Sequence, residues 1–348
     1  MVGGDTGSAG SLVARILAGS WRSQPPPVDF SAYELESVED RLMASGSAGL
    51  TWNRIKYDPR IAGSDVGSRF ADAHRMHILH AGLHDQHLSQ VLTALGDAGV
   101  RPIVFKGWDS SRLYPDRGMR PFGDIDLLIP PSQLEFARET LRDHGGLTDV
   151  DLEHPVEMGG SSLNELFERA VPTEHGGVEV LTLSDEDRLR VLCIHFLKSG
   201  GWRPLNLCDI AAVLEGGGVS DASTCLTTSR AVVSWVGSTI ACARDLLGAD
   251  LGASPWAGGL PPAPRWLTKA IIEAWGHPFP AEWGPAPPLL PPLSDPVGVA
   301  RNLPQRWPSP VVSTIMTGSP VNRLPRPPFQ LAYLARRAAR YLATQKER

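Results

Sequence analysis

Two aspartates in the otherwise apolar segment Asp124–Ile129 have the residue type and spacing for metal chemistry. The segment is predicted to be a β-strand, and side chains alternate along a strand, so Asp124 and Asp126 point to the same side. Two carboxylates this close repel each other unless a positive charge lies between them. Mg²⁺ prefers carboxylate and phosphate oxygens. The pair therefore predicts a site for Mg²⁺ (or Mn²⁺).

A candidate anion site precedes this metal site along the chain. The branched, apolar segment Pro102–Phe105 predicts a buried strand, and Lys106-Gly107 directly after it allows a sharp turn. A short helix is then predicted at Trp108–Leu113, with its first turn capped by one of Asp109, Ser110 or Ser111. Its unpaired N-terminal amides suit a phosphate group. An anion site and a metal site on two neighbouring strands match the needs of metal-dependent phosphoryl or nucleotidyl transfer.

The same stretch carries a family resemblance. Phe105-Lys106-Gly107, Tyr114-Pro115, Arg120-Pro121 and Asp124-Ile125-Asp126-Leu127 resemble the DNA polymerase beta-like nucleotidyltransferase superfamily, and within it the bacterial "uncharacterised nucleotidyltransferase" family. Members of that family occur beside biosynthetic genes, including those for lasso peptides. The usual Gly-Ser or Gly-Gly of the superfamily is Lys-Gly here, which is typical of the narrower family. The resemblance implies an α+β fold, with a small mixed β-sheet core flanked by helices and a mainly helical C-terminal part.

The resemblance also implies a donor and a set of site residues. The donor is expected to be a nucleoside triphosphate, with ATP the first choice, contacted by Lys106, Gly107, Ser110 and Arg120. Asp124 and Asp126 are expected to hold the metal, and a third carboxylate on a neighbouring strand would complete the site and act as general base. We expect that strand at Thr148–His154, with Asp151 as the first choice and Glu153 as the second, because Asp149, Asp151 and Glu153 would share one face.

Polar residues of the C-terminal part match positions that recur in the family, namely His195, Lys198, Arg203 and Asp209. They are expected either to face the nucleotide base or the acceptor, or to form an ion-pair and capping network that joins two helices. The sequence does not separate these alternatives.

Composition limits the function classes. A chain of 348 residues with net charge −5 fits two domains or one elaborated domain, and lacks the basic surface of a general binder of long nucleic acid. Four widely spaced cysteines predict reduced, buried thiols. Neither a signal peptide nor a membrane span is expected, so the predicted location is the cytoplasm. Oligomeric state is not predicted.

The remaining elements are predicted from periodicity, caps and breakers. We expect an N-terminal helical extension (1–65), a nucleotidyltransferase core (66–182) and a helical, proline-rich C-terminal domain (183–348). Five histidines between His74 and His87 fan over a wide arc of the long helix Phe70–Gly99, and we expect no functional metal there. The other expected helices are Leu12–Ala18, Ala32–Met43, Pro131–His144 with Phe136 on its buried side, Arg188–Lys198 after a cap at Ser184, Trp202–Leu214, Thr227–Leu247, Trp266–Trp275, Val297–Asn302 and Leu331–Thr344, with a further strand at Gly177–Leu181.

Together these features predict transfer of a nucleoside monophosphate group to a hydroxyl or phosphate of a small-molecule, peptide or protein acceptor, with peptide natural-product tailoring as one setting. Two alternatives stay open. One is a glycosyltransferase that uses the Asp-x-Asp pair with a sugar nucleotide. The other is a degenerate scaffold that binds nucleotide without turnover.

Overall fold

The computed structural model describes residues 6–143, 150–153, 162–226, 229–277 and 307–346 of the chain, without the side chains of residues 6, 153 and 340–346. A five-stranded mixed sheet has the order β3-β2-β1-β5-β4. Its strands are β1 (Ile103–Phe105), β2 (Ile125–Leu128), β3 (Val150–Glu153), β4 (Val171–His175) and β5 (Val178–Thr182). β1 is antiparallel to β2 and parallel to β5, β2 is parallel to β3, and β4 is antiparallel to β5. Within the described part of the chain, the expected α+β class is confirmed.

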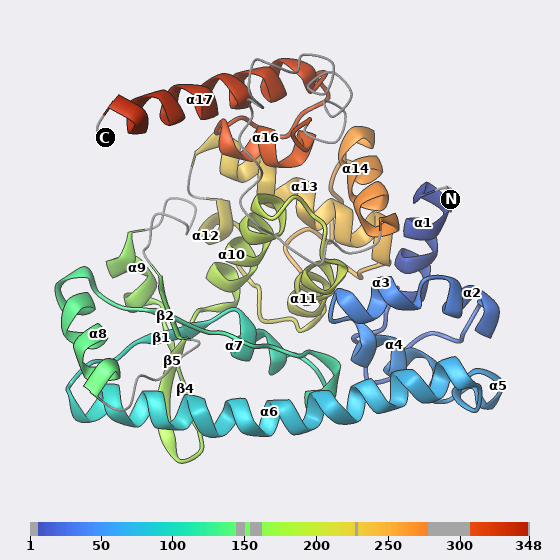
Figure 1. The fold of residues 1–348 in the computed structure, drawn as a ribbon, viewed down its shortest axis with the longest axis horizontal. Coiled ribbons are helices and arrows are strands. Elements are labelled where there is room, and N and C mark those ends of the chain that lie inside the picture. The colour runs from blue at the N-terminus through green and yellow to red at the C-terminus, as the bar shows by residue number, and fades with distance from the viewer. Residues whose placement is uncertain (1–5, 144–149, 154–161, 227–228, 278–306, 347–348) are drawn as a thin grey trace.

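Helices surround the sheet and build the rest of the molecule (Figure 1). The 33-residue helix α6 runs the length of the molecule along one side of the sheet. The helices are α1 (Thr6–Leu17), α2 (Ala32–Ser37), α3 (Glu39–Ala44), α4 (Ala48–Ile55), α5 (Pro59–Ala62), α6 (Asp65–Asp97), α7 (Gly107–Ser111), η1 (Arg117–Met119), η2 (Pro131–Gln133), α8 (Leu134–Asp143), α9 (Leu163–Glu168), α10 (Asp185–Lys198), α11 (Pro204–Glu215), α12 (Ala222–Leu226), α13 (Arg230–Leu247), α14 (Arg265–Gly276), α16 (Pro310–Met316) and α17 (Pro327–Lys346).

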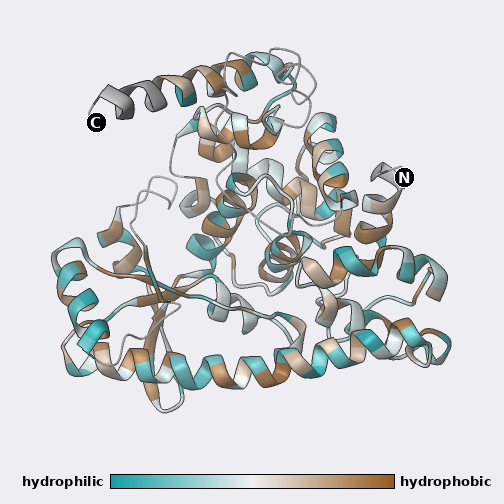
Figure 2. Cartoon of the chain, in the orientation of Figure 1, coloured by the Kyte–Doolittle hydropathy of each residue, from teal (hydrophilic) through white to brown (hydrophobic). Residues whose placement is uncertain are grey.

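Alternation along the strands gives the sheet two apolar faces. Val104, Ile125 and Leu127 are buried in one cluster with residues of α6 and α8, and Phe105 and Leu128 are buried in another with residues of α9 and α10. The strands are accordingly coloured mostly as hydrophobic in Figure 2. Because both faces are covered, only the ends of the strands are left for polar chemistry.

A second, larger core joins the two ends of the chain. Apolar residues of the N-terminal helices and of α10 to α16 belong to one buried cluster, in which Leu17 and Leu50 are grouped with Leu197, Ile240 and Leu267. The segments expected as an N-terminal extension and a C-terminal domain therefore share a single core. All four cysteines are free and buried, as predicted.

Most expected elements are present in the described residues, with several corrections. Ser184 caps α10 as predicted, since its side chain accepts a hydrogen bond from the Asp187 amide. The expected helix Ala32–Met43 is two helices that meet at Val38, and β4 was not predicted. The expected burial of Phe136 is wrong, because this side chain is 51% exposed. The expected helix Val297–Asn302 lies outside the described residues. In the described part of the chain no helix has the length and apolarity to cross a membrane.

Candidate active site

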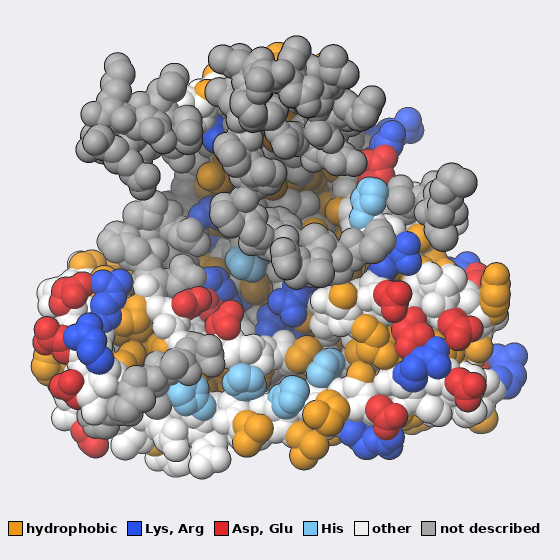
Figure 3. Space-filling view, in the orientation of Figure 1, with side chains coloured by type: hydrophobic (Ala, Val, Ile, Leu, Met, Phe, Trp, Pro, Cys, Tyr) orange, Lys and Arg blue, Asp and Glu red, His pale blue; other side chains and the backbone are white. Residues whose placement is uncertain are grey.

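A cavity of about 540 Å³ lies where the ends of β1, β2 and β3 face helices α10 and α11. Acidic and basic side chains adjoin in the middle of this side of the molecule (Figure 3). The cavity is lined by Lys106, Gly107, Arg120, Pro121, Phe122, Gly123, Asp124, Asp126, Asp151, Leu192, His195, Arg203 and Asn206. The core and the C-terminal helices thus each contribute a wall.

The core wall holds three carboxylates. Asp126 of β2 and Asp151 of β3 are register partners on neighbouring parallel strands, and Asp124 stands two residues before Asp126. All three line the cavity, as expected from alternation along the strands. Glu153 pairs through its backbone with Leu128, farther along β3, and its side chain lies outside the described part.

The donor chemistry of these carboxylates suits a hard divalent cation. In the described part of the chain, however, no group of three or more His, Cys, Asp or Glu side chains is already arranged around a metal position. The Lys106 Nζ lies 3.0 Å from Asp126 Oδ1 instead. The residues therefore fit Mg²⁺ by their chemistry, with an ammonium group in contact with one of the expected ligands.

Lys106 occupies a strained turn between β1 and α7. Its backbone has φ 54° and ψ −120°, and it stands at the N-cap position of α7 without a side-chain capping bond. The expected caps Asp109, Ser110 and Ser111 instead lie inside this short helix, so that expectation is wrong. Gly107 follows, and a Cβ there would meet Phe122 at 3.1 Å and the Asp124 carbonyl oxygen at 3.2 Å. The turn therefore packs directly against the segment that leads into β2.

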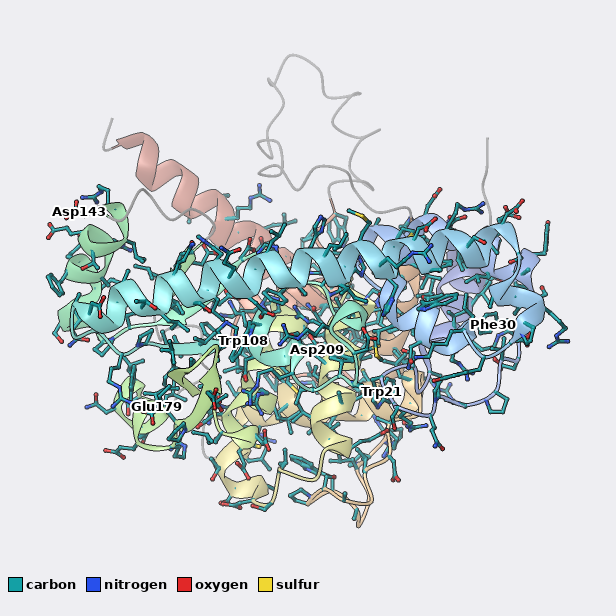
Figure 4. All side chains as sticks on the ribbon, turned by 90° about the horizontal axis from the view of Figure 1, so that it is seen from below. Trp21, Phe30, Trp108, Asp143, Glu179 and Asp209 are labelled. Atoms are coloured by element: carbon teal, nitrogen blue, oxygen red, sulfur yellow. The ribbon has the colours of Figure 1, made fainter. Side chains whose placement is uncertain are left out.

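Arg120 lines the cavity, and its guanidinium group forms an ion pair with a buried carboxylate. Asp209 of α11, near the centre of the molecule in Figure 4, accepts hydrogen bonds from Arg120 Nη2 at 2.9 Å and from the Tyr114 hydroxyl at 2.7 Å. Burial alone would lower the pKa of Arg120, but the Asp209 carboxylate outweighs burial and raises that pKa. Asp209 thus serves the ion-pair role, one of its two predicted alternatives, and fixes the loop before Asp124.

Of the other expected contacts, His195 and Arg203 line the cavity. Ser110 is fully buried, and Lys198 and Asp209 are also absent from the lining. A second buried pair, Asp109 with Arg188 of α10 at 2.7 Å, joins α7 to the C-terminal helices. These contacts hold the two walls of the cavity against each other.

Comparison with known proteins places this geometry in a family. Residues 42–156 match the family model described as "Uncharacterised nucleotidyltransferase". The match covers about a third of the chain, and in this segment the chain is similar to nucleotidyltransferases of that family. Neither the curated proteins nor the solved structures contain a significant match to the chain.

The matched segment includes β1, β2, the three carboxylates and nine of the thirteen residues that line the cavity. Arg203 and Asn206, which complete the lining from α11, lie beyond it. Asn206 was not predicted from the sequence to line the site. Its position at the third residue of a helix that opens with Arg-Pro was the available signal, but no pattern indicated that this end of the helix faces the carboxylates.

Histidines of α6 pack against the loop between α7 and β2. They form a row along the helix in Figure 3. His74 Nε2 lies 2.9 Å from Asp116 Oδ1, and His77 Nδ1 lies 3.2 Å from the Gly118 carbonyl oxygen. The His84 ring packs on Phe122, a residue of the cavity wall. Burial lowers the pKa of His77. These contacts account for three of the histidines as packing partners of the loop.

Proposed function

We propose that the protein transfers a nucleoside monophosphate group from a nucleoside triphosphate, with ATP as the first candidate, to a hydroxyl group in a Mg²⁺-dependent reaction (Mn²⁺ being the alternative ion). The observation that supports this is the convergence of Asp124, Asp126 and Asp151 on one cavity within the matched segment. The same cavity is lined by two cationic side chains, Lys106 and Arg120. Carboxylates for a metal and cations for phosphates are the two requirements of nucleotidyl transfer.

In the proposed mechanism, Asp124 and Asp126 would hold Mg²⁺, with Asp151 nearby on β3. The bound ion would supply charge neutralisation at the phosphate oxygens. Asp151 accepts the proton of the acceptor hydroxyl, whose oxygen bonds to the α-phosphorus. The bond between the α-phosphorus and the bridging oxygen of the β-phosphate breaks, and its electron pair leaves with pyrophosphate. Lys106 orients Asp126 through its 3.0 Å contact and adds positive charge beside the phosphates.

The acceptor belongs to one of three classes: a small molecule, a peptide or a protein side chain, attacking through a hydroxyl or a phosphate. Peptide natural-product tailoring is the setting that the family resemblance suggests. The four buried free thiols are compatible with a cytoplasmic reaction, where nucleoside triphosphates are available.

The test is a thermal-shift panel of ATP, GTP, CTP, UTP and UDP-glucose, each with and without Mg²⁺ or Mn²⁺. A ligand at 100 times its Kd stabilises a protein by about 2.7 kcal/mol, which corresponds to about 4 °C for a chain of this size. Wild type is compared with an Asp124→Asn, Asp126→Asn double variant and with Asp97→Asn, a control at the end of α6 that is not among the cavity residues.

Metal-dependent stabilisation by one nucleoside triphosphate, lost only in the double variant, is the expected result. Pyrophosphate release on addition of candidate acceptors then establishes turnover. A response to UDP-glucose alone would favour the glycosyltransferase, and triphosphate binding that never leads to pyrophosphate would favour a non-catalytic scaffold. Equal responses from wild type and the double variant would refute the proposed metal site.

A further inference from the structure

The C-terminal wall of the cavity is built from the start of α11. Arg203 is the N-cap residue of this 12-residue helix, and its side chain makes no capping bond. Asn206, in the first turn, lines the cavity and is 5% exposed. Among the residues that the structure describes, none forms a side-chain hydrogen bond with the Asn206 carboxamide. The Asn206 carboxamide is therefore available to a ligand in the cavity, at the positive end of a helix, which favours an anion.

The Arg203 side chain is held in place by the segment that follows α3. Its Nε donates a hydrogen bond of 2.9 Å to the Ser45 carbonyl oxygen, at the end of α3. A Cβ on Gly46 would lie 2.8 Å from Arg203 Nη2, and the Gly46 φ of +75° also favours glycine. The same imagined Cβ would meet Pro121 at 3.5 Å, so this corner also contains the loop before β2. The hydrogen bond to Ser45 uses only Nε and fixes the orientation of the guanidinium group. The two Nη groups are left for another partner.

Charge distinguishes Arg203 from the other cavity cations. Lys106 contacts Asp126, and Arg120 contacts Asp209. Within the described residues, no carboxylate forms a salt bridge with Arg203. Burial, reinforced by the nearby Arg120 charge, lowers the pKa of Arg203 to about 10. A cation in this condition gains from an anionic ligand that replaces its lost hydration.

The position of Arg203 identifies the side of the reaction that it serves. The carboxylate charges that act on it are those of Asp209 and of Asp124, the first of the proposed metal ligands. The proposed base, Asp151, is on the neighbouring strand and marks the acceptor side. The corner at Gly46 also brings Arg203 close to Pro121, which directly follows the proposed phosphate contact Arg120, so we assign Arg203 to the donor side of the cavity.

We propose that Arg203 and Asn206, at the N-terminus of α11, form a subsite for the terminal phosphoryl groups of the donor triphosphate. The identity of the anion rests on the proposed function. Two Nη groups can bind two phosphate oxygens as a fork, and the Asn206 amide donates to a third. In this arrangement the C-terminal helices, beyond the family-matched segment, decide whether a triphosphate is held.

The subsite is tested by calorimetric titration of inorganic triphosphate in EDTA at low ionic strength, where neither metal nor turnover contributes. We expect wild type to bind, Arg203→Gln to bind about 10- to 100-fold more weakly, and Asn206→Leu about 5- to 10-fold more weakly. Arg203→Lys should fall between wild type and Arg203→Gln because it keeps the charge and loses the fork. Asp124→Asn should bind at least as well as wild type because a repelling carboxylate is removed.

Arg101→Gln, a change at an exposed arginine on the far end of β1, is the matched control and should leave binding unchanged. Circular dichroism verifies folding, and Asn206→Leu carries the test if Arg203→Gln does not fold. Absence of triphosphate binding by wild type, or equal binding by wild type and a folded Arg203→Gln, would overturn the subsite. The subsite would also be overturned if Arg203→Gln lost as much affinity for AMP, which lacks the terminal phosphoryl groups, as for ATP. Arg203-dependent triphosphate binding by a protein that releases no pyrophosphate would uphold the subsite and refute the transfer reaction.

Discussion

Glycine usually makes a protein less stable than alanine does at the same position, and the strained turn at Lys106 predicts the reverse. Among the described residues, Lys106 is the one non-glycine residue with positive φ. Such a backbone costs an L-amino acid about 1–3 kcal/mol, whereas glycine adopts it freely. We therefore predict that Lys106→Gly is more stable to unfolding than Lys106→Ala.

The size of the difference follows from what the two variants share. Both lose the contact of Lys106 with Asp126, whose side chains are 14% and 13% exposed. Only Lys106→Gly relieves the strain, and it loses about 0.5–1 kcal/mol to the greater freedom of glycine in the unfolded chain. The expected net advantage of glycine over alanine is about 1 kcal/mol.

Urea unfolding measures the free energies, with a matched pair of substitutions at Lys269 as control. Lys269 lies inside α14, is 75% exposed along its side chain and has helical backbone geometry. There alanine should be more stable than glycine by about 1 kcal/mol. Alanine equal to or better than glycine at position 106 would refute the strain. We also expect Lys106→Gly to lose nucleotidyl transfer, because the ammonium group that orients Asp126 is gone.

Three further predictions concern stability. Asp209→Asn leaves the Arg120 guanidinium buried without its carboxylate, and should lower the free energy of unfolding by about 3–5 kcal/mol in urea titration; no loss would show that the pair is dispensable. Burial alone would raise the pKa of Glu215, but hydrogen bonds from Arg22 outweigh burial and lower that pKa. Ionised Glu215 therefore stabilises the folded protein fully above about pH 5, and this contribution to the free energy of unfolding is lost as the pH falls below 4.5. The difference between the thermal midpoints of wild type and Glu215→Gln should accordingly be largest at pH 7 and shrink as the pH falls below 4.5, and a constant gap would contradict the linkage. Gly49→Ala would place a Cβ 1.9 Å from a backbone oxygen of η1 and should cost about 3 kcal/mol, visible as a lower thermal midpoint than that of the exposed control Gly82→Ala.

Local patterns in the sequence predicted carboxylates that the structure brings to one cavity, while their roles in metal binding and catalysis stay predictions. Alternation along a short strand was enough to place Asp124 and Asp126 on one side of β2, and the parallel register of β3 then brings Asp151 beside them. The cap at Ser184 was equally local, since a serine before three acids has one dominant interpretation.

Features that depend on contacts between distant segments could not be read in this way. Arg203 and Asp209 are close in sequence and were predicted together, yet one faces the cavity and the other is buried against Arg120. The difference arises because α11 begins at the cavity and continues into the core, which only the tertiary structure determines. Phe136 likewise follows the apolar pattern of α8 but meets no partner that covers it.

The docking of α1 on α14 has a consequence for how the chain is made. A Cβ on Gly10 would lie 1.8 Å from the Ile272 carbonyl oxygen, so the two helices meet backbone to backbone. The apolar residues Ile16 and Leu17 are fully buried in the finished protein. During synthesis at about 5–20 residues per second, the roughly 260 residues that separate these helices take about 13–52 s to emerge from the ribosome. For that interval the side of α1 that packs on α14 has no partner, and we expect the nascent chain to expose apolar surface there to which chaperones can bind.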